Sequence, residues 1–421
     1  MGLSERSLEN GSVLSARALG VRFLLVCCLL GYGLRFGFLV AGSEQFSRDL
    51  GDQLRYLSEA ENLLDHGTFA TSMDKGPTAF DGPVYAVFLV PFLALFRGNP
   101  GVSVAAVQSV VSLLTAWMLA QIAWLITRRV WAARIALLWW CVYPFAVFYS
   151  AYILSETLYT AGIVASVWCA YLFSRDLRLR TALLFGLVLG LTSLTRPTIN
   201  PCIPFLFLAV LAFRWDERRR TLKGLVISGL VLAAVLIPWI ARNYTVFGRI
   251  LPGSSQVGRM LYLANNPGNQ TGYVVIPRDA DPPGQDLYEN ELEYNDRLGD
   301  LAKEFIRENP GRFLWLCGMR VCRFWWPVPV YEKFSSPLLL IGSFFTFMPL
   351  FAAALWGVVL LRREWRILLP ILGVILATYL LHLVFGVSMR YRFPIEPLLI
   401  IPASYSLSLL FQSRFTPHRS V

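Results

Sequence analysis

The sequence predicts an all-α protein that crosses a membrane about ten times and carries juxtamembrane helices in two large extracytoplasmic loops. Its composition is the first observation: 56% of the 421 residues are hydrophobic and 15% are charged, and the mean hydropathy is +0.53. This is too apolar for a water-soluble protein of this size. The second is that apolar stretches of about 20 residues, enough for a helix to span a bilayer, recur along the chain.

Eight apolar stretches have the length of a single span, and a ninth is too long for one. The ninth, 181–214, is interrupted by Thr195-Arg-Pro-Thr-Ile-Asn-Pro201, so we expect two helices joined by a tight turn. The other eight are 18–41, 101–127, 131–150, 152–174, 222–241, 337–361, 366–386 and 394–412. By contrast, 83–96 contains Pro91 and would extend only about 20 Å as a helix, so we expect it along the membrane surface.

The charge pattern predicts the orientation. With the N-terminus in the cytoplasm, the basic clusters at 128–134, 175–180, 214–223 and 362–366 all face the cytoplasm, as the positive-inside rule requires. The net charge of +11 then reflects topology and attraction to anionic membrane lipids, and nucleic acid is not an expected partner.

This orientation divides the chain into three parts. Residues 1–241 form an N-terminal transmembrane module with a first outer loop at 42–100, 242–336 a large extracytoplasmic loop, and 337–421 a C-terminal transmembrane module. Within the large loop, Pro, Gly and Asn at 265–272 and 277–284 predict irregular structure. Amphipathic helices are expected at 287–309, packed on the first loop, and at 312–326, where Arg and Trp alternate as in headgroup-level helices.

The first outer loop is the expected place for chemistry, because about forty polar and acidic residues are more than a connection needs. Asp52 and Tyr56 are four positions apart and share one face of an expected helix. Glu59, Glu61 and Asp65 are expected on a solvated face of the same helix.

Several charges near the outer surface are not explained by topology. A charged side chain inside a membrane costs about 2.5 to 3.5 kcal/mol on insertion scales, so it usually has a partner or a task. Arginine binds phosphate through paired hydrogen bonds, which predicts an anionic ligand. These charges are Arg35, Arg196, Arg242, Arg390 and Arg392. For Arg390 and Arg392, the alternative is pairing with Glu396 or with lipid phosphates.

Glu156 begins a span at the outer face and should lie beside the first loop. Two interpretations are open. The carboxylate is part of the site, or it stabilises the first turn of a helix that Ser155 caps.

These motifs, in their order, resemble the GT-C class of membrane glycosyltransferases that use polyprenyl-phosphate sugars. The branch resembled is glycosyltransferase family 39, with the protein O-mannosyltransferases and the lipid A aminoarabinose transferase. The motifs are Asp52-x-x-x-Tyr56, Gly82-Pro83-Val-Tyr85, Ser155-Glu156-Thr157, Arg390-Tyr391-Arg392-x-Pro394, and Pro238-Trp239 with Arg242-Asn243-Tyr244.

The resemblance implies roles for these residues. Asp52 is the expected catalytic base, with Glu156 and Tyr56 beside it, and the outer arginines are expected to bind the donor phosphate. Further candidates are Tyr85, Tyr391, Asn243 and Asp81. Asp81 is a departure, because relatives often have Lys or Arg there followed by two prolines, and it could be a second site acid. Inversion at the anomeric carbon is also implied.

The expected function is transfer of a hexosyl or pentosyl group from a polyprenyl-phosphate donor to a lipid, glycan or protein acceptor. The resemblance places the protein in the bacterial inner membrane, with its active site on the extracytoplasmic side. The sequence has no G-x-G-x-x-G or P-loop motif for a nucleotide sugar. No cofactor is required, although Asp52 with Glu156 or Asp81 could hold a divalent cation. The alternatives are a transporter or flippase of a lipid-linked or anionic solute, and an envelope scaffold protein.

Overall fold

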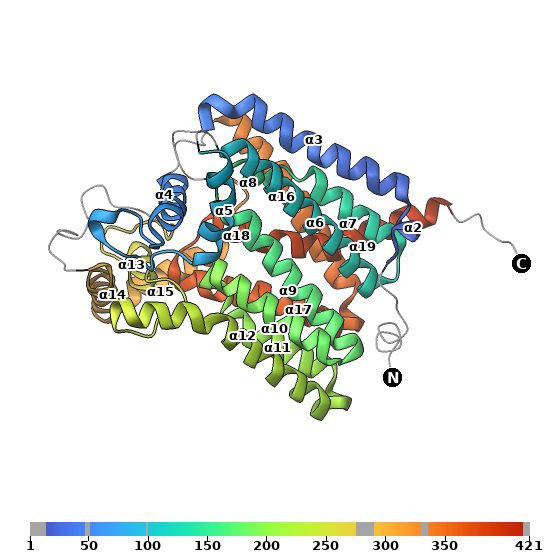
Figure 1. Cartoon of the computed structure of the whole chain (residues 1–421). Helices are drawn as coiled ribbons and strands as arrows, with labels where there is room; N and C mark the ends of the chain where they lie inside the picture. Colours follow the sequence, from blue (N-terminus) through green and yellow to red (C-terminus); the bar gives the residue numbers. More distant parts are fainter. Residues whose placement is uncertain (1–13, 47–50, 98–99, 275–289, 330–335, 416–421) are drawn as a thin grey trace, which may run out of the picture.

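The computed structural model describes residues 14–46, 51–97, 100–274, 290–329 and 336–415. In these residues the chain is helical, and the only β pairing is an isolated bridge between Tyr273 and Val387. Long helices form a bundle, both chain ends lie at one end of it, and shorter helices cover the other end (Figure 1).

Among the described residues, seven helices are long and apolar enough to span a membrane, and there are eight such segments if a bent pair is counted as one span. The seven are α3 (Val21–Phe46), α6 (Gly101–Thr127), α9 (Glu156–Asp176), α12 (Arg218–Phe247), α16 (Pro337–Leu360), α17 (Trp365–Phe385) and α19 (Glu396–Phe415). The pair is α7 (Val130–Val142) and α8 (Pro144–Ala151), which meet at an angle of 48°. Pro144 has no backbone N–H to continue α7, which accounts for the bend. The protein is therefore an integral, multi-pass membrane protein.

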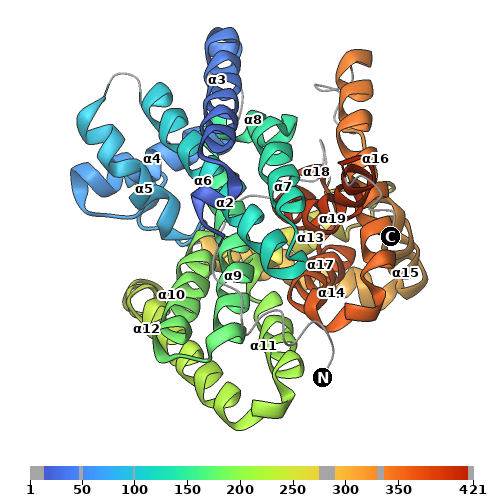
Figure 2. The same ribbon diagram turned by 90° about the vertical axis from the view of Figure 1, so that its right-hand side faces the viewer.

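Two shorter apolar helices, α10 (Leu179–Thr195) and α11 (Cys202–Phe213), follow α9. They are shorter than the seven helices and the bent pair above, so the described residues contain up to eight of the ten expected spans. The break between α10 and α11 falls at the expected turn, which contains the 3₁₀ helix η2 (Pro197–Ile199). Close packing of α10 on α12 depends on Gly186, because a Cβ atom there would lie 2.3 Å from the Ser228 carbonyl oxygen. Figure 2 shows α10 beside α12 at one edge of the bundle, with α9 between α10 and α11.

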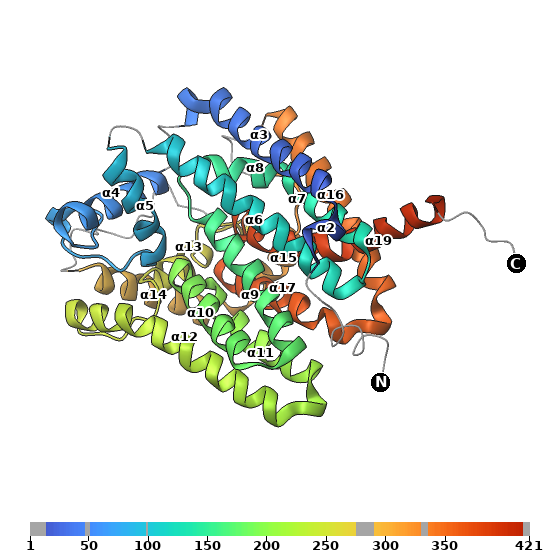
Figure 3. The ribbon, with the colours of Figure 1, turned by 45° about the vertical axis from the view of Figure 1, so that its right-hand side comes forward.

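We call the shorter helices at the end of the bundle away from the chain termini the capping layer. It consists of α4 (Gly51–His66), α5 (Pro83–Leu95), α13 (Val257–Ala264), α14 (Glu291–Glu308) and α15 (Pro310–Arg323). Figures 1 and 3 show α4 and α5 from the first loop next to α13 and α14 from the second. Helix α5 is short, as expected, whereas α13 was not expected. Residues 277–284 of the expected irregular region lie outside the described residues.

The remaining elements are short. They are α2 (Ala16–Leu19), α18 (Met389–Arg392), and the 3₁₀ helices η1 (Met73–Lys75), η3 (Trp215–Glu217), η6 (Arg362–Glu364) and η7 (Phe393–Ile395).

Residues 68–82, which we call the strap, join α4 to α5 and are fixed by the second loop. Arg242, near the end of α12, donates to the carbonyl oxygens of Phe69 and Thr78 at 3.0 and 2.7 Å. Glu291 of α14 accepts from the Thr78 hydroxyl at 2.5 Å and from the Ala79 N–H at 2.6 Å. The expected packing of the 287–309 helix on the first loop is therefore confirmed.

The expected solvated face of α4 is wrong for Glu59. Glu61 and Asp65 are exposed, but the Glu59 side chain is fully buried, and neither carboxylate oxygen has a hydrogen-bond partner in the described residues. Burial, and after it the charge of Asp81, raises the pKa of Glu59 to about 9. A carboxylic acid in these surroundings is neutral at pH 7.

Candidate active site

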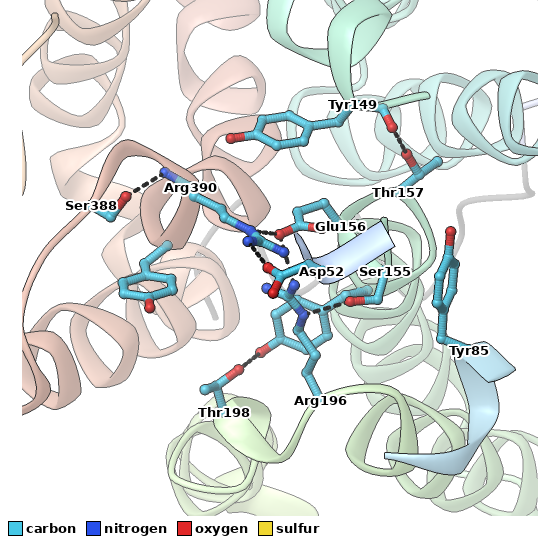
Figure 4. Close-up of polar contacts among 12 residues, drawn as sticks. Asp52, Tyr85, Tyr149, Ser155, Glu156, Thr157, Arg196, Thr198, Ser388 and Arg390 are labelled. Carbon is cyan, nitrogen blue, oxygen red and sulfur yellow. Dashed lines mark hydrogen bonds and ion pairs between the residues drawn. The ribbon is translucent and has the colours of Figure 1, made fainter. Parts of the chain in front are cut away.

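A cavity of about 1240 Å³ lies between the capping layer and the spans. Its wall is formed by α4, the end of the strap, α13, the turn after α10, the last turn of α17, and α18. Segments from both outer loops and from the C-terminal part of the chain thus meet at one place, which Figure 4 shows in close-up.

Asp52 occupies the first turn of α4 and lines the cavity. Its Oδ1 accepts a hydrogen bond from Arg55 Nη1 at 2.8 Å, and its Oδ2 accepts one from Arg390 Nη1. Burial opposes ionisation, but the charges and hydrogen bonds of Arg390 and Arg55 outweigh it, so the pKa of Asp52 is lowered. Asp52 is therefore a carboxylate at every physiological pH, with both oxygens occupied.

Glu156 lies behind the cavity wall rather than on it. Its side chain is 0% exposed, and one oxygen, Oε1, accepts from Arg196 Nη2 at 2.7 Å and from Arg390 Nε. The other oxygen has no partner among the described residues. Figure 4 shows the Arg390 side chain between Glu156 and Asp52. Glu156 therefore binds two cavity-lining arginines from behind the wall.

Ser155 does not cap α9 through its side chain. Its hydroxyl accepts from Arg196 Nε at 2.8 Å and shares a hydrogen bond of 3.0 Å with the Tyr56 hydroxyl. The expected side-chain cap by Ser155 is therefore wrong, whereas Glu156 does lie in the first turn of α9. The side chains of both residues bind arginines that line the cavity.

Arg55 is a residue that the sequence interpretation missed. It bridges Asp52 and Asp81, donating from Nε to Asp81 Oδ2 at 2.5 Å. The other Asp81 oxygen accepts from Gln256 Nε2 at 3.1 Å. The spacing of three between Asp52 and Arg55 on one helix face could have identified this pair. With Arg196 and Arg390, three guanidiniums balance the three carboxylates of this cluster.

Two of the three candidate tyrosines, Tyr56 and Tyr85, have different positions relative to the cavity. Tyr56 lines the cavity, and burial, followed by the charge of Asp81, raises its pKa to about 12, so its hydroxyl stays protonated. Tyr85 is fully buried beside Tyr56, with ring centroids 4.8 Å apart, and donates to Gln108 Oε1. Tyr85 does not line the cavity; it supports Tyr56.

Of the five arginines expected to bind phosphate, only Arg196 and Arg390 line the cavity. Arg35 is buried and donates to the carbonyl oxygens of Gly31, Trp140 and Cys141 and to Ser112 Oγ. Arg242 holds the strap and also donates to Asn243 Oδ1.

Arg392 is buried, pairs with Glu396 at 2.7 Å, and donates to the carbonyl oxygens of Phe324 and Trp326. We therefore correct the expected phosphate contacts of Arg35, Arg242 and Arg392 to structural roles: each uses its guanidinium inside the protein. Asn243, which donates to the Leu251 carbonyl oxygen, is likewise structural.

Two cavity-lining arginines were not expected. Arg259 on α13 lies over the ring of Phe80, with its Cζ 5.4 Å from the centroid, and Arg323 at the end of α15 lies over Tyr273 at 5.1 Å. Neither has a carboxylate partner in the described residues, and Arg323 Nη1 has no hydrogen-bond partner there. Tyr391 also lines the cavity, with its ring 5.1 Å from that of His382. The cavity therefore carries an excess of positive charge.

The described residues contain no group of three His, Cys, Asp or Glu side chains arranged to hold a metal ion. Both oxygens of Asp52 face guanidinium groups, which are the partners of a carboxylate in an anion-binding site. The divalent cation that the sequence leaves open stays a prediction.

The bundle, the capping layer and the cavity between them define the fold of the GT-C class of membrane glycosyltransferases. Residues 78–241 match the family model described as dolichyl-phosphate-mannose-protein mannosyltransferase. No curated protein sequence matches the chain significantly.

Solved structures show the same fold. The Archaeoglobus fulgidus oligosaccharyltransferase in the apo form has 14% identity and a TM-score of 0.56, covering 94% of this chain and 51% of that one. ArnT from Cupriavidus metallidurans bound to undecaprenyl phosphate has 13% identity and a TM-score of 0.56, covering 93% and 60%. Its apo state gives a TM-score of 0.54 at 13% identity, with the same coverage. The chain thus spans about half to three fifths of these proteins.

Proposed function

We propose that this protein transfers a sugar from a polyprenyl-phosphate donor to an acceptor hydroxyl on the extracytoplasmic side of the membrane. The observation that carries the proposal is the Asp52 carboxylate, ionised and held between Arg55 and Arg390 in the wall of a large, cationic cavity. The family matched by residues 78–241, and a similar fold solved with undecaprenyl phosphate bound, support this donor class.

In the reaction, the acceptor oxygen attacks the anomeric carbon as the bond to the phosphate oxygen breaks. The electron pair of that bond leaves with the polyprenyl phosphate, and the acceptor proton passes to Asp52. The products are a glycosylated acceptor and polyprenyl phosphate, and by resemblance to the family the anomeric centre inverts.

In this scheme the arginines bind the donor phosphate and also control how strong a base Asp52 is. Arg259 and Arg323 have no acidic partner in the described residues, so they are free to bind the donor phosphate. Negative charge grows on the phosphate as the bond breaks, and fixed guanidiniums stabilise that charge. Arg390 links the two tasks, because a phosphate that draws it away from Asp52 also makes Asp52 a stronger base.

The arrangement of charge in the fold supports the extracytoplasmic location. Helix α2, the end of α19 and the basic cluster at 128–134 lie at the end of the bundle opposite the capping layer (Figure 1). By the positive-inside rule that end is cytoplasmic, and the cavity then faces outward.

The test is sugar transfer by the purified protein from a polyprenyl-phosphate sugar, comparing wild type with Asp52→Asn. Loss of a catalytic base typically lowers kcat by about 10²- to 10⁴-fold. Asp65→Asn is the matched control, since Asp65 is exposed on the same helix and pairs only with Arg97 in the described residues.

Equal kcat for wild type and Asp52→Asn would overturn the role of Asp52. Movement of a lipid-linked solute across vesicle membranes, without any sugar transfer, would instead identify a transporter.

A further inference from the structure

One part of the cavity wall consists of polar, uncharged side chains supplied mainly by the spans. We call it the neutral wall. Its members are Tyr159, Thr198, Asn200, Thr378, His382 and Tyr391. They come from α9, the turn between α10 and α11, α17 and α18, and none takes part in the proton transfer described above. Figure 4 shows Thr198 beside Arg196, next to the Asp52 cluster.

His382 presents an unused acceptor to the cavity. The residue lies in the last turn of α17, is 5% exposed, and has its Nδ1 2.7 Å from the Thr378 carbonyl oxygen. A carbonyl oxygen only accepts, so Nδ1 carries the hydrogen and Nε2 of the neutral ring is an acceptor. No donor contacts Nε2 within the described part of the chain. An acceptor without a partner at a cavity wall favours a ligand that donates to it.

Asn200 presents an unused donor. Its Oδ1 accepts from the Ser193 hydroxyl at 2.6 Å, which fixes the orientation of the amide. Its Nδ2 then has no partner among the described residues and is available in the cavity. The neutral wall therefore offers one acceptor and one donor, which match hydroxyl groups that both donate and accept. A prenyl chain offers neither.

The neutral wall and Asp52 line the same cavity. The His382 ring contacts that of Tyr391, with centroids 5.1 Å apart, and Tyr391 follows Arg390, which binds Asp52. A sugar with its anomeric carbon near Asp52 could therefore extend its hydroxyls toward His382.

We infer that His382 determines specificity for the donor sugar, and that its Nε2 accepts a hydrogen bond from one sugar hydroxyl while Asn200 Nδ2 donates to another. This inference rests on the proposed transferase function. A site built to bind a hydroxyl discriminates strongly against the analogue that lacks it, because its buried polar group is then left unpaired.

The experiment uses polyprenyl-phosphate sugars in which each hydroxyl in turn is replaced by hydrogen, with wild type and His382→Phe. In wild type, removal of the contacted hydroxyl should lower kcat/KM by about tenfold or more. His382→Phe should lower kcat/KM for the parent donor by a similar factor and no longer distinguish it from that one deoxy donor. Tyr379→Phe is the matched control, since Tyr379 is on α17 but does not line the cavity.

Asn200→Ala gives a second measurement if His382→Phe does not fold, and should abolish discrimination at a different hydroxyl. Variants that keep the wild-type ratio for every deoxy donor would overturn the inference while leaving the proposed function intact. A wild-type protein that transfers no sugar from any donor would remove the proposed function, and the inference with it.

Discussion

Arg390 donates a hydrogen bond to the carboxylate of Asp52, 338 positions earlier in the chain. The contact joins the first outer loop to the C-terminal span, and it sets the protonation state of the proposed base.

Removal of Arg390 should raise the pKa of Asp52. Arg390 and Arg55 keep that pKa below its ordinary value, so the carboxylate stays ionised as the pH falls. In Arg390→Ala the acid limb of the kcat/KM profile should move to higher pH, and kcat should fall at least about tenfold. The shift is measured from kcat/KM for sugar transfer by wild type and by Arg390→Ala between pH 4 and pH 8. An acid limb at the wild-type position would contradict it.

Replacement of Glu59 by Gln should stabilise the protein at alkaline pH. The pKa of Glu59 is about 9 in the fold against a reference of 4.5. The folded protein therefore binds this proton more tightly than the unfolded chain, and stability falls as pH rises from about 4.5 toward 9. At pH 7 the loss is on the order of 3 kcal/mol. Thermal unfolding in detergent at pH 5 and pH 8.5 should show the greater gain for Glu59→Gln at pH 8.5. The exposed Glu61→Gln is the control, and equal gains at both pH values would refute the burial argument.

Arg259 and Arg323 should matter for donor binding. Alanine at either position removes a cavity cation without an acidic partner in the described residues, and should weaken binding of polyprenyl phosphate by about tenfold. Arg249→Ala is the control, because Arg249 belongs to the same side of the molecule but pairs with exposed Asp296. Titration of purified protein with polyprenyl phosphate measures the affinity. Equal affinity in all three variants would show that the phosphate binds elsewhere.

Arg392 should affect stability rather than donor binding. Its removal leaves the Glu396 carboxylate buried without its cation, which typically costs about 3 to 5 kcal/mol. We expect a lower Tm for Arg392→Met, and a partial recovery in the double variant Arg392→Met with Glu396→Gln. Donor KM in protein that folds should stay within about twofold of wild type. A raised KM with an unchanged Tm would restore Arg392 to the phosphate site.

The sequence predicted most of the long apolar helices because length and apolar composition are local properties, although the helices at 179–195 and 202–213 are shorter than the expected spans. The turn at 195–201 and the short surface helix α5 were predicted because proline acts locally as well. Helix α13 has only eight residues and lies between Pro- and Asn-rich segments, so its periodicity was too short to recognise. Arg259 was therefore missed with it.

The site was predicted in part. Asp52 was singled out by the acidic first loop and by the motif that resembles the family. Arg196 and Arg390 line the same cavity as Asp52, and these two arginines were singled out because topology did not explain their charges. That argument cannot separate Arg390 from Arg392, which are two positions apart and face different partners. The burial of Glu59 depends on tertiary packing of the strap and α5 over α4, which no local pattern reveals.

Because Arg392 and Glu396 form a buried pair, the number of residues in segment 390–396 matters for the site. The pair spans one helical turn, and Tyr143 at the bend between α7 and α8 donates to the same carboxylate at 2.8 Å. Residues 390–396 are thus held against the bundle in one orientation about the helix axis. One inserted residue would turn Arg390 by about 100° about the helix axis relative to that anchor. Substitutions around this segment can be absorbed locally, but insertions and deletions within it should abolish the contact with Asp52.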